Sequence, residues 1–174
     1  MSSLDLRDYI RDVPDFPKPG ILFRDITPLL RSPQAFGDTI ERLAGPYRGE
    51  SVTQVAAVES RGFIFGGAMA RALGCGFVPI RKPAKLPWKT FRHEYELEYG
   101  SDALEIHDDA LGPADRVVIV DDVLATGGTA AAATALVSMF GSRIIGLAVV
   151  IELLFLAGRK RLDGIPVHTL IGYE

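Results

Sequence analysis

The chain has 174 residues, 48% of them hydrophobic, and a formal net charge of −3. This is enough for one domain, residues 1–174, with a substantial core, while the longest apolar stretches are too short to span a membrane. The slightly negative charge argues against a broad nucleic-acid surface, and the single cysteine, Cys75, excludes an intramolecular disulfide. We therefore expect a soluble protein that binds neither nucleic acid nor membranes.

The beginning of the chain, Met1–Asp12, mixes acids and arginines with leucines. It lacks the apolar core and the small-residue cleavage site of a secretory signal, so we expect a cytoplasmic protein. A short helix is predicted over Leu4–Arg11. A second helix is predicted near Pro33–Leu43, with Ser32 as its N-cap and Pro33 as its first residue.

Strand and helix patterns alternate through much of the remaining chain. Strands are predicted, in chain order, at Thr53–Val58, Phe77–Ile80, Val117–Val120, Ile144–Ile151 and Val167–Ile171. A predicted helix over Arg61–Leu73, ended by Gly74, connects the first two. This alternation predicts an α/β fold with a mostly parallel twisted sheet that is flanked by helices on both faces.

The segment of residues 81–100 departs from this alternation. Its positive charge comes from Arg81, Lys82, Lys85, Lys89 and Arg92. Taken alone, such a run is typical of a solvated loop, but its place between two strands favours a mobile loop that meets an anion. After it, apolar residues alternate at Tyr95, Leu97, Tyr99, Leu104 and Ile106, which predicts an antiparallel pair of strands around a turn at residues 100–102.

The most informative stretch is VVIVDDVLATGGT, Val117–Thr129. Four apolar residues without alternation are typical of a strand that is covered on both faces, so Asp121 and Asp122 would lie at its carboxyl edge. The turn that follows is built of small residues, Ala125, Thr126, Gly127, Gly128 and Thr129. Its backbone N–H groups can approach an anion closely, and both threonines can donate hydroxyls. A helix over Ala130–Phe140, with Gly141 as C-cap, would direct its positive end at the same anion.

The two acids, Asp121 and Asp122, restrict which anions the turn can bind. Beside a phosphate they would be repelled, unless they face hydroxyl groups or share a cation. A sugar phosphate with a vicinal diol and Mg²⁺ satisfies both conditions. The turn lacks the Gly-Lys-Ser/Thr ending of a triphosphate-binding loop, which favours a monophosphate. The alternative interpretation is an acidic strand end followed by an ordinary turn.

This order of residues resembles the phosphoribosyl-diphosphate (PRPP) motif of the type I phosphoribosyltransferases. Further segments resemble the adenine-specific members, so the match covers nearly the whole chain: Phe16–Leu30, Glu59–Gly66, Arg81–Pro87, Tyr95–Gly100 and Ile151–Lys160. The resemblance implies transfer of 5-phosphoribosyl from PRPP to adenine, giving AMP and pyrophosphate, with Mg²⁺ as cofactor. It also implies the type I fold, with an N-terminal base-binding hood within residues 1–32 and a flexible catalytic loop.

The resemblance implies roles for the residues that match the family. The turn Ala125–Thr129 would bind the 5′-phosphate, and Asp121 and Asp122 would lie near the ribose hydroxyls and near the Mg²⁺ that PRPP carries. Pyrophosphate would be contacted by the cations Arg61, Arg81, Lys82 and Lys85, with Arg81 reaching across the interface of a homodimer. No metal bound by protein groups alone is expected, and the histidines, His93, His107 and His168, lack metal-ligand spacing.

Base recognition is implied for the segment Pro19–Asp25. Phe23 matches an aromatic residue that stacks on adenine in the family, while backbone groups at the positions of Leu22 and Arg24 contact the edge of the base. Judged from its position alone, Phe23 is favoured as a core aromatic instead.

The implied reaction displaces pyrophosphate from the anomeric carbon, which builds positive charge on the ribose and negative charge on the leaving group. The enzyme should stabilise both charges, with Arg61 at the leaving group. Glu98 matches the acid/base candidate of the family, and Tyr99 would help to position the closing loop. On the pattern alone, Glu98 could instead be one of three glutamates, with Glu94 and Glu96, on a solvated strand face.

Two other functions remain open. A transferase for another base would keep everything except base recognition, and a PRPP-binding regulator would keep the phosphate turn but would need a DNA-binding segment. Departures from the family concern the loop, where Ala84 stands at a position that is often glycine and Trp88 and Lys89 add bulk. They affect the expected loop kinetics and leave the expected reaction unchanged.

Overall fold

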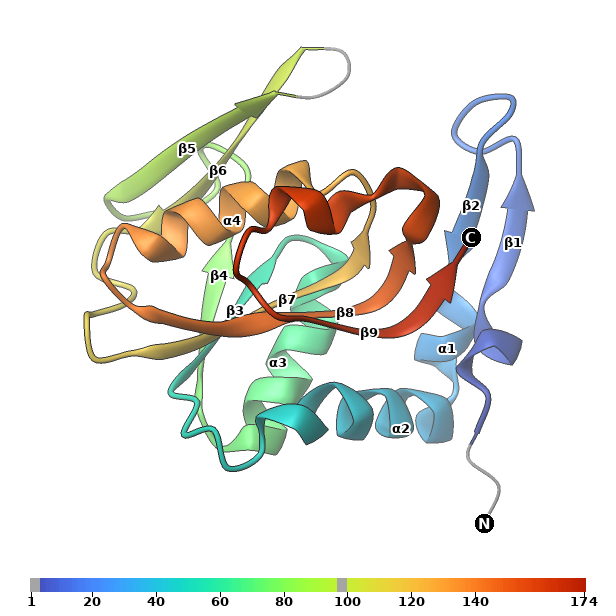
Figure 1. Ribbon diagram of the computed structural model, residues 1–174, viewed down its shortest axis with the longest axis horizontal. Coiled ribbons are helices and arrows are strands. Elements are labelled where there is room, and N and C mark those ends of the chain that lie inside the picture. Colours follow the sequence, from blue (N-terminus) through green and yellow to red (C-terminus); the bar gives the residue numbers. More distant parts are fainter. Residues whose placement is uncertain (1–3, 97–99) are drawn as a thin grey trace.

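A five-stranded parallel sheet forms the centre of the computed structural model, which describes residues 4–96 and 100–174 (Figure 1). The strand order is β4-β3-β7-β8-β9, and every neighbouring pair is parallel. The strands are β3 (Gln54–Val58), β4 (Gly76–Ile80), β7 (Arg116–Leu124), β8 (Arg143–Leu153) and β9 (Val167–Tyr173). The predicted α/β fold with a mostly parallel sheet is confirmed.

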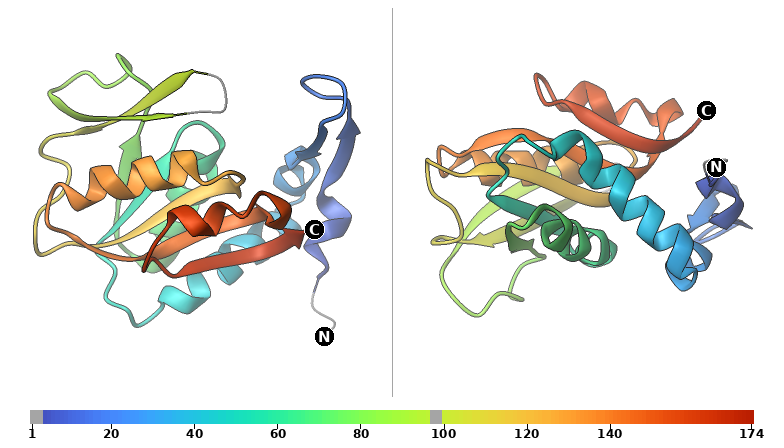
Figure 2. Two further views of the ribbon diagram at one scale, coloured as in Figure 1. Left: turned by 45° about the horizontal axis from the view of Figure 1, so that its top comes forward. Right: turned by 90° about the horizontal axis from the view of Figure 1, so that it is seen from below.

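Helices cover both faces of this sheet (Figures 1 and 2). One face carries α1 (Thr27–Arg31), α2 (Pro33–Ala44) and α3 (Arg61–Leu73), and the other carries α4 (Gly128–Ser138). In β7, Val118 and Val120 face the first group, whereas Val117 and Ile119 face α4. Burial on both faces explains the apolar run without alternation. No helix in the described part of the chain is long and apolar enough to cross a bilayer.

Two antiparallel hairpins stand beside the central sheet (Figure 1). The first pairs β1 (Arg11–Pro14) with β2 (Leu22–Asp25), near the C-terminal end of β9. The second pairs β5 (Thr90–Glu96) with β6 (Ser101–His107) and packs against α4. Short 3-10 turns complete the chain: η1 (Leu6–Tyr9), η2 (Gly45–Tyr47), η3 (Leu154–Leu156) and η4 (Gly158–Arg161).

The N-terminal prediction is wrong in part. The expected helix over Leu4–Arg11 is only the 3-10 turn η1, because the Asp5 carboxylate caps the N–H of Arg7 and the chain enters β1 at Arg11. The second predicted helix is confirmed, since the Ser32 hydroxyl accepts the N–H of Ala35 at 3.2 Å.

Other boundaries also differ from the sequence-based expectation. The strand β7 continues through both aspartates to Leu124, because pairing with β8 extends to Leu124 and Glu152. The helix α4 starts at Gly128 and ends at Ser138, before Gly141. Asp102 lies inside β6, paired with Tyr95, and does not belong to a turn.

The close packing of α3 on β3 gives a test of the fold. A Cβ placed on Gly66 would lie 2.5 Å from the Ala57 Cβ and 3.1 Å from the Phe77 ring, whereas one on Gly67 would meet nothing within 4 Å. We expect Gly66→Ala to lower the free energy of unfolding by about 2 kcal/mol, because overpacking outweighs the gain in helix propensity. The control Gly67→Ala should raise it by about 0.5–1 kcal/mol. Urea denaturation measures both, and equal effects would contradict this packing.

Candidate active site

A cavity of about 410 Å³ opens at the carboxyl edge of the sheet, where β3, β4 and β7 end. Its lining comes from three segments that are far apart in sequence. The lining residues are Val58, Glu59, Ser60, Arg61, Lys82 and every residue from Asp121 to Ala130. The sequence-predicted phosphate turn, both aspartates, Arg61 and Lys82 are thus brought together.

The turn of residues 125–129 has the geometry of an anion cradle. Gly127 adopts a left-handed φ of +84° and serves as the N-cap of α4, and no side chain caps this helix end. The free N–H groups of the first helical turn and the positive end of the helix dipole therefore remain available for a phosphate.

Backbone contact with a distant segment shapes this turn. A Cβ on Gly127 would lie 2.3 Å from the carbonyl oxygen of Gly158, and a Cβ on Gly158 would lie 2.3 Å from the carbonyl oxygen of Ala125. Only glycine at both positions permits this approach. Sequence reasoning assigned no role to Gly158, although it lies in the stretch IELLFLAGRK that carried part of the family resemblance.

An ion pair anchors that distant segment. The Arg159 guanidinium donates two hydrogen bonds of 2.6 Å to Glu152, which is 3% exposed at the end of β8, and Thr169 donates a third of 2.7 Å. The hydrogen bonds from Arg159 hold the pKa of Glu152 below its ordinary value, although burial acts in the opposite direction. The carboxylate therefore stays charged, and η4 stays attached to the sheet.

The two aspartates of β7 differ in their environment. Asp122 is 6% exposed and forms an ion pair with Nε of Arg61, the first residue of α3. The Asp121 carboxylate accepts the N–H of Asp122 at 2.8 Å. Burial, followed by the neighbouring Asp122 carboxylate, raises the pKa of Asp121 well above its ordinary value, while Arg61 acts against this rise. A cation or a hydroxyl donor at this place would offset the cost of charging Asp121.

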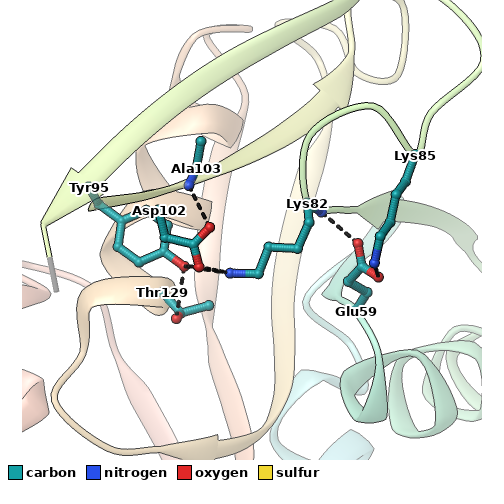
Figure 3. Close-up of polar contacts among 7 residues, drawn as sticks. All are labelled: Glu59, Lys82, Lys85, Tyr95, Asp102, Ala103 and Thr129. Atoms are coloured by element: carbon teal, nitrogen blue, oxygen red, sulfur yellow. Dashed lines mark hydrogen bonds and ion pairs between the residues drawn. The ribbon is translucent and has the colours of Figure 1, made fainter. Parts of the chain in front are cut away.

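Glu59 binds the basic segment that follows β4 (Figure 3). Its carboxylate accepts hydrogen bonds from Nζ of Lys85 at 2.8 Å and from the backbone N–H of Lys82 at 2.6 Å, and Arg81 lies 3.4 Å away. Burial opposes the charge, but these hydrogen bonds hold the pKa of Glu59 below its ordinary value. Arg81 and Lys85 therefore lie beside the cavity with their charges directed to Glu59, and neither lines it.

The predicted base-binding residues lie on β2. Leu22 is 46% exposed, and Phe23 belongs to neither buried core cluster. The Arg61 guanidinium lies 5.5 Å from the centre of the Phe23 ring, so this ring borders the cavity region. The Arg24 guanidinium packs at 3.8 Å over the Tyr173 ring and pairs with Asp12, which leaves only its backbone for a ligand.

The predicted acid/base residues, Glu98 and Tyr99, lie outside the described residues. Next to them in sequence, Tyr95 on β5 places its hydroxyl 3.4 Å from Oγ1 of Thr129. Tyr95 does not line the cavity, whereas Val123 and Leu124 do. Sequence reasoning missed these three residues, because Tyr95 was interpreted as part of a strand pattern and no role was predicted for Val123 and Leu124.

Comparison with known proteins agrees with this geometry. The family model described as a phosphoribosyl transferase domain matches residues 29–167. An adenine phosphoribosyltransferase from Solibacter usitatus is 56% identical over 98% of both chains. The chain belongs to the adenine phosphoribosyltransferase family. The member from Thermotoga maritima is 54% identical over 99% of this chain and the whole of that protein.

Solved structures of the family share the fold. The adenine phosphoribosyltransferase of Thermoanaerobacter pseudethanolicus superposes with a TM-score of 0.93 at 52% identity, covering 97% of this chain and 98% of that one. The Saccharomyces cerevisiae enzyme, solved with adenine and an imino-altritol bisphosphate, gives a TM-score of 0.91 at 43% identity, covering 95% and 96%. The expected type I phosphoribosyltransferase fold is thereby confirmed.

The glycine contact predicts a specific defect. Gly158→Ala would push a methyl group against the Ala125 carbonyl, so we expect PRPP affinity to fall by at least about tenfold, since a shift of the order of 1 Å is costly in such a site. Calorimetric titration with PRPP and Mg²⁺ measures this change. Gly112→Ala is the control, because its Cβ would lie 3.9 Å from the nearest side-chain atom. Unchanged affinity in Gly158→Ala would contradict the contact.

Proposed function

We propose that this protein transfers the 5-phosphoribosyl group of PRPP to adenine and releases AMP and pyrophosphate, as an enzyme of purine salvage. The observation that carries this proposal is the single cavity in which the glycine turn of α4 adjoins the Asp121–Asp122 pair and Arg61. Membership of the adenine phosphoribosyltransferase family supports it. A cytoplasmic location and a single domain over residues 1–174 stay predictions.

In this proposal each part of PRPP meets a matching group. The 5′-phosphate binds the free N–H groups and hydroxyls of Ala125, Thr126, Gly127, Gly128 and Thr129. The ribose hydroxyls donate to Asp121 and Asp122, which are acceptors at the cavity wall. The pyrophosphate meets Arg61 and Lys82, and Arg81 and Lys85 join them when they leave Glu59.

The residues present also fit Mg²⁺ that arrives with the substrate. Mg²⁺ is commonly bound by one or two carboxylates together with substrate phosphates, and Asp121 and Asp122 supply such carboxylates. Burial and the neighbouring Asp122 raise the pKa of Asp121, and a bound cation would offset them by favouring the ionised form. When bound, Mg²⁺ would neutralise charge on the pyrophosphate leaving group.

The protein groups act on charge that develops in the transition state. As the bond to pyrophosphate lengthens, the ribose ring gains positive charge, and the Asp121 and Asp122 carboxylates lie where they can stabilise it. The Arg61 guanidinium can follow the departing pyrophosphate, and its ion pair with Asp122 orients it towards the cavity. No covalent nucleophile from the protein is required.

Adenine would bind between the Phe23 ring and the cavity, with its edge on the β2 backbone. In the described residues β2 pairs only with β1, so one backbone edge is free of strand partners. Pro14, which pairs with Leu22, has no N–H to donate. We therefore expect the backbone polar groups of Leu22 and Arg24 to point away from β1, towards a base.

The remaining roles rest on the family resemblance. Glu98 would manage the proton on adenine, and Tyr99 would help to position the loop. A homodimer would place Arg81 near the site of the second copy. The exposed apolar side chains Ile64 on α3 and Phe77 on β4, 42% and 38% exposed, support such an interface.

The substrate can be tested directly. We expect pyrophosphate release from PRPP and Mg²⁺ with adenine, and removal of Mg²⁺ with EDTA should abolish it. Parallel assays with hypoxanthine, guanine and orotate measure base selectivity. Release with another base but not with adenine would assign a different transferase. PRPP binding without release for any base would favour a regulator.

The role of Glu98 needs a separate experiment. We expect Glu98→Gln to lower kcat by about 100-fold while the KM for PRPP stays near the wild-type value, because general acid–base catalysis typically contributes this much. Glu94→Gln, on the same alternating strand pattern, is the control and should keep full activity. If both variants turn over like the wild type, the acid/base assignment is wrong.

A further inference from the structure

The β5–β6 hairpin is fastened to the rest of the molecule by a small polar cluster (Figure 3). Nζ of Lys82, which follows β4, forms an ion pair with Asp102 of β6 and donates to the Tyr95 hydroxyl of β5 at 3.1 Å. That hydroxyl lies 3.3 Å from the Asp102 carboxylate and 3.4 Å from Oγ1 of Thr129. Three segments of the fold therefore meet at one phenol.

Each member of the cluster is constrained. The Asp102 carboxylate also accepts the N–H of Ala103 at 2.8 Å, and the side chains of Lys82 and Asp102 are only 34% and 30% exposed. Burial opposes both charges, but their mutual hydrogen bond raises the pKa of Lys82 and lowers the pKa of Asp102. The pair therefore stays ionised and can orient the phenol through charge-assisted hydrogen bonds.

The contact with the phosphate turn is close. A Cβ placed on Gly128 would lie 3.5 Å from the Tyr95 ring and 3.8 Å from the carbonyl oxygen of Glu96, so β5 lies directly over the first residue of α4. Thr129, which follows Gly128, is one of the two hydroxyl residues of the turn. Among the described residues, no layer of side chains separates the hairpin from the turn, so a shift of one can directly shift the other.

The Tyr95 hydroxyl has a single proton, and the choice of its acceptor links these contacts. Its oxygen accepts from Lys82, and its single proton can go to Asp102 or to Thr129. When the phenol donates to Oγ1 of Thr129, the proton of Thr129 is free to point at an anion in the turn. A bound phosphate that accepts this proton therefore favours the arrangement in which the hairpin is fastened.

We propose that Asp102 is a positioning residue. Through Lys82 and Tyr95 it couples the packing of the β5–β6 hairpin against α4 to the binding of phosphate in the turn of residues 125–129. Coupling of this kind is reciprocal, so the hairpin strengthens PRPP binding by the factor by which PRPP stabilises the hairpin. This inference rests on the proposed function of the turn.

The experiment compares Asp102→Asn and Tyr95→Phe with the wild type and with Asp109→Asn. The control removes the same charge from an exposed residue just after β6 that makes no ion pair within the described residues. We expect Asp102→Asn and Tyr95→Phe to raise the Kd and the KM for PRPP about tenfold, the scale of a charge-assisted hydrogen bond. The KM for adenine should stay within error of the control.

Hydrogen exchange of the β5 and β6 amides gives the second measurement. PRPP with Mg²⁺ should slow this exchange in the wild type and in Asp109→Asn, and much less in Asp102→Asn and Tyr95→Phe. Asp102→Glu should restore part of the PRPP affinity, and the double variant should bind PRPP no more weakly than Tyr95→Phe alone, because both changes break one chain of contacts.

The outcomes separate this inference from the proposed function. If the wild type binds PRPP but forms no AMP from adenine, the proposed function fails, while the shift in PRPP affinity still decides the inference. If the wild type forms AMP and both variants bind PRPP like Asp109→Asn, the inference is wrong. Equal losses for PRPP and adenine would assign Asp102 a purely structural role and also overturn the inference.

Discussion

The candidate site depends on one constraint: β3, β7 and β8 run parallel and side by side, so their carboxyl ends share one edge. This arrangement brings the acids Glu59, Asp122 and Glu152 to one region, and α3 and α4 begin at the same edge. Carboxylates and positive helix ends therefore occupy neighbouring places. In the proposed function the positive helix ends attract the phosphate, and the carboxylates accept hydrogen bonds from the sugar hydroxyls.

Ion pairs link acids and basic residues at this edge and beside it. Asp122 binds Arg61, Glu59 binds Lys85 and contacts Arg81, and Asp102 binds Lys82. In the proposed function a diphosphate would compete with these carboxylates for the same cations, so its free energy of binding would be a difference between two sets of ion pairs.

Sequence patterns predicted the features that depend on neighbouring residues. The buried run before Asp121, the glycine turn and the alternation of strands and helices are all local signals. The hairpin β1–β2 was missed because its strands have four residues each and are mostly exposed. The Gly127–Gly158 contact and the cluster around Asp102 join distant segments, and no spacing rule reports them. The roles of Glu98 and Tyr99 remain predictions. Asp102 was predicted to lie in a turn, because the alternation of apolar residues does not show at which residue the pairing of two strands begins.

The backbone contact between Gly127 and Gly158 has a consequence for biosynthesis. The phosphate turn leaves the ribosome well before η4, and η4 is anchored by Arg159 to Glu152 and to the carbonyl of Val167 at the start of β9. A nascent chain thus contains every residue of the turn before it contains the support that shapes it. If PRPP binds this turn as proposed, it can stabilise the shaped turn only after η4 has been synthesised.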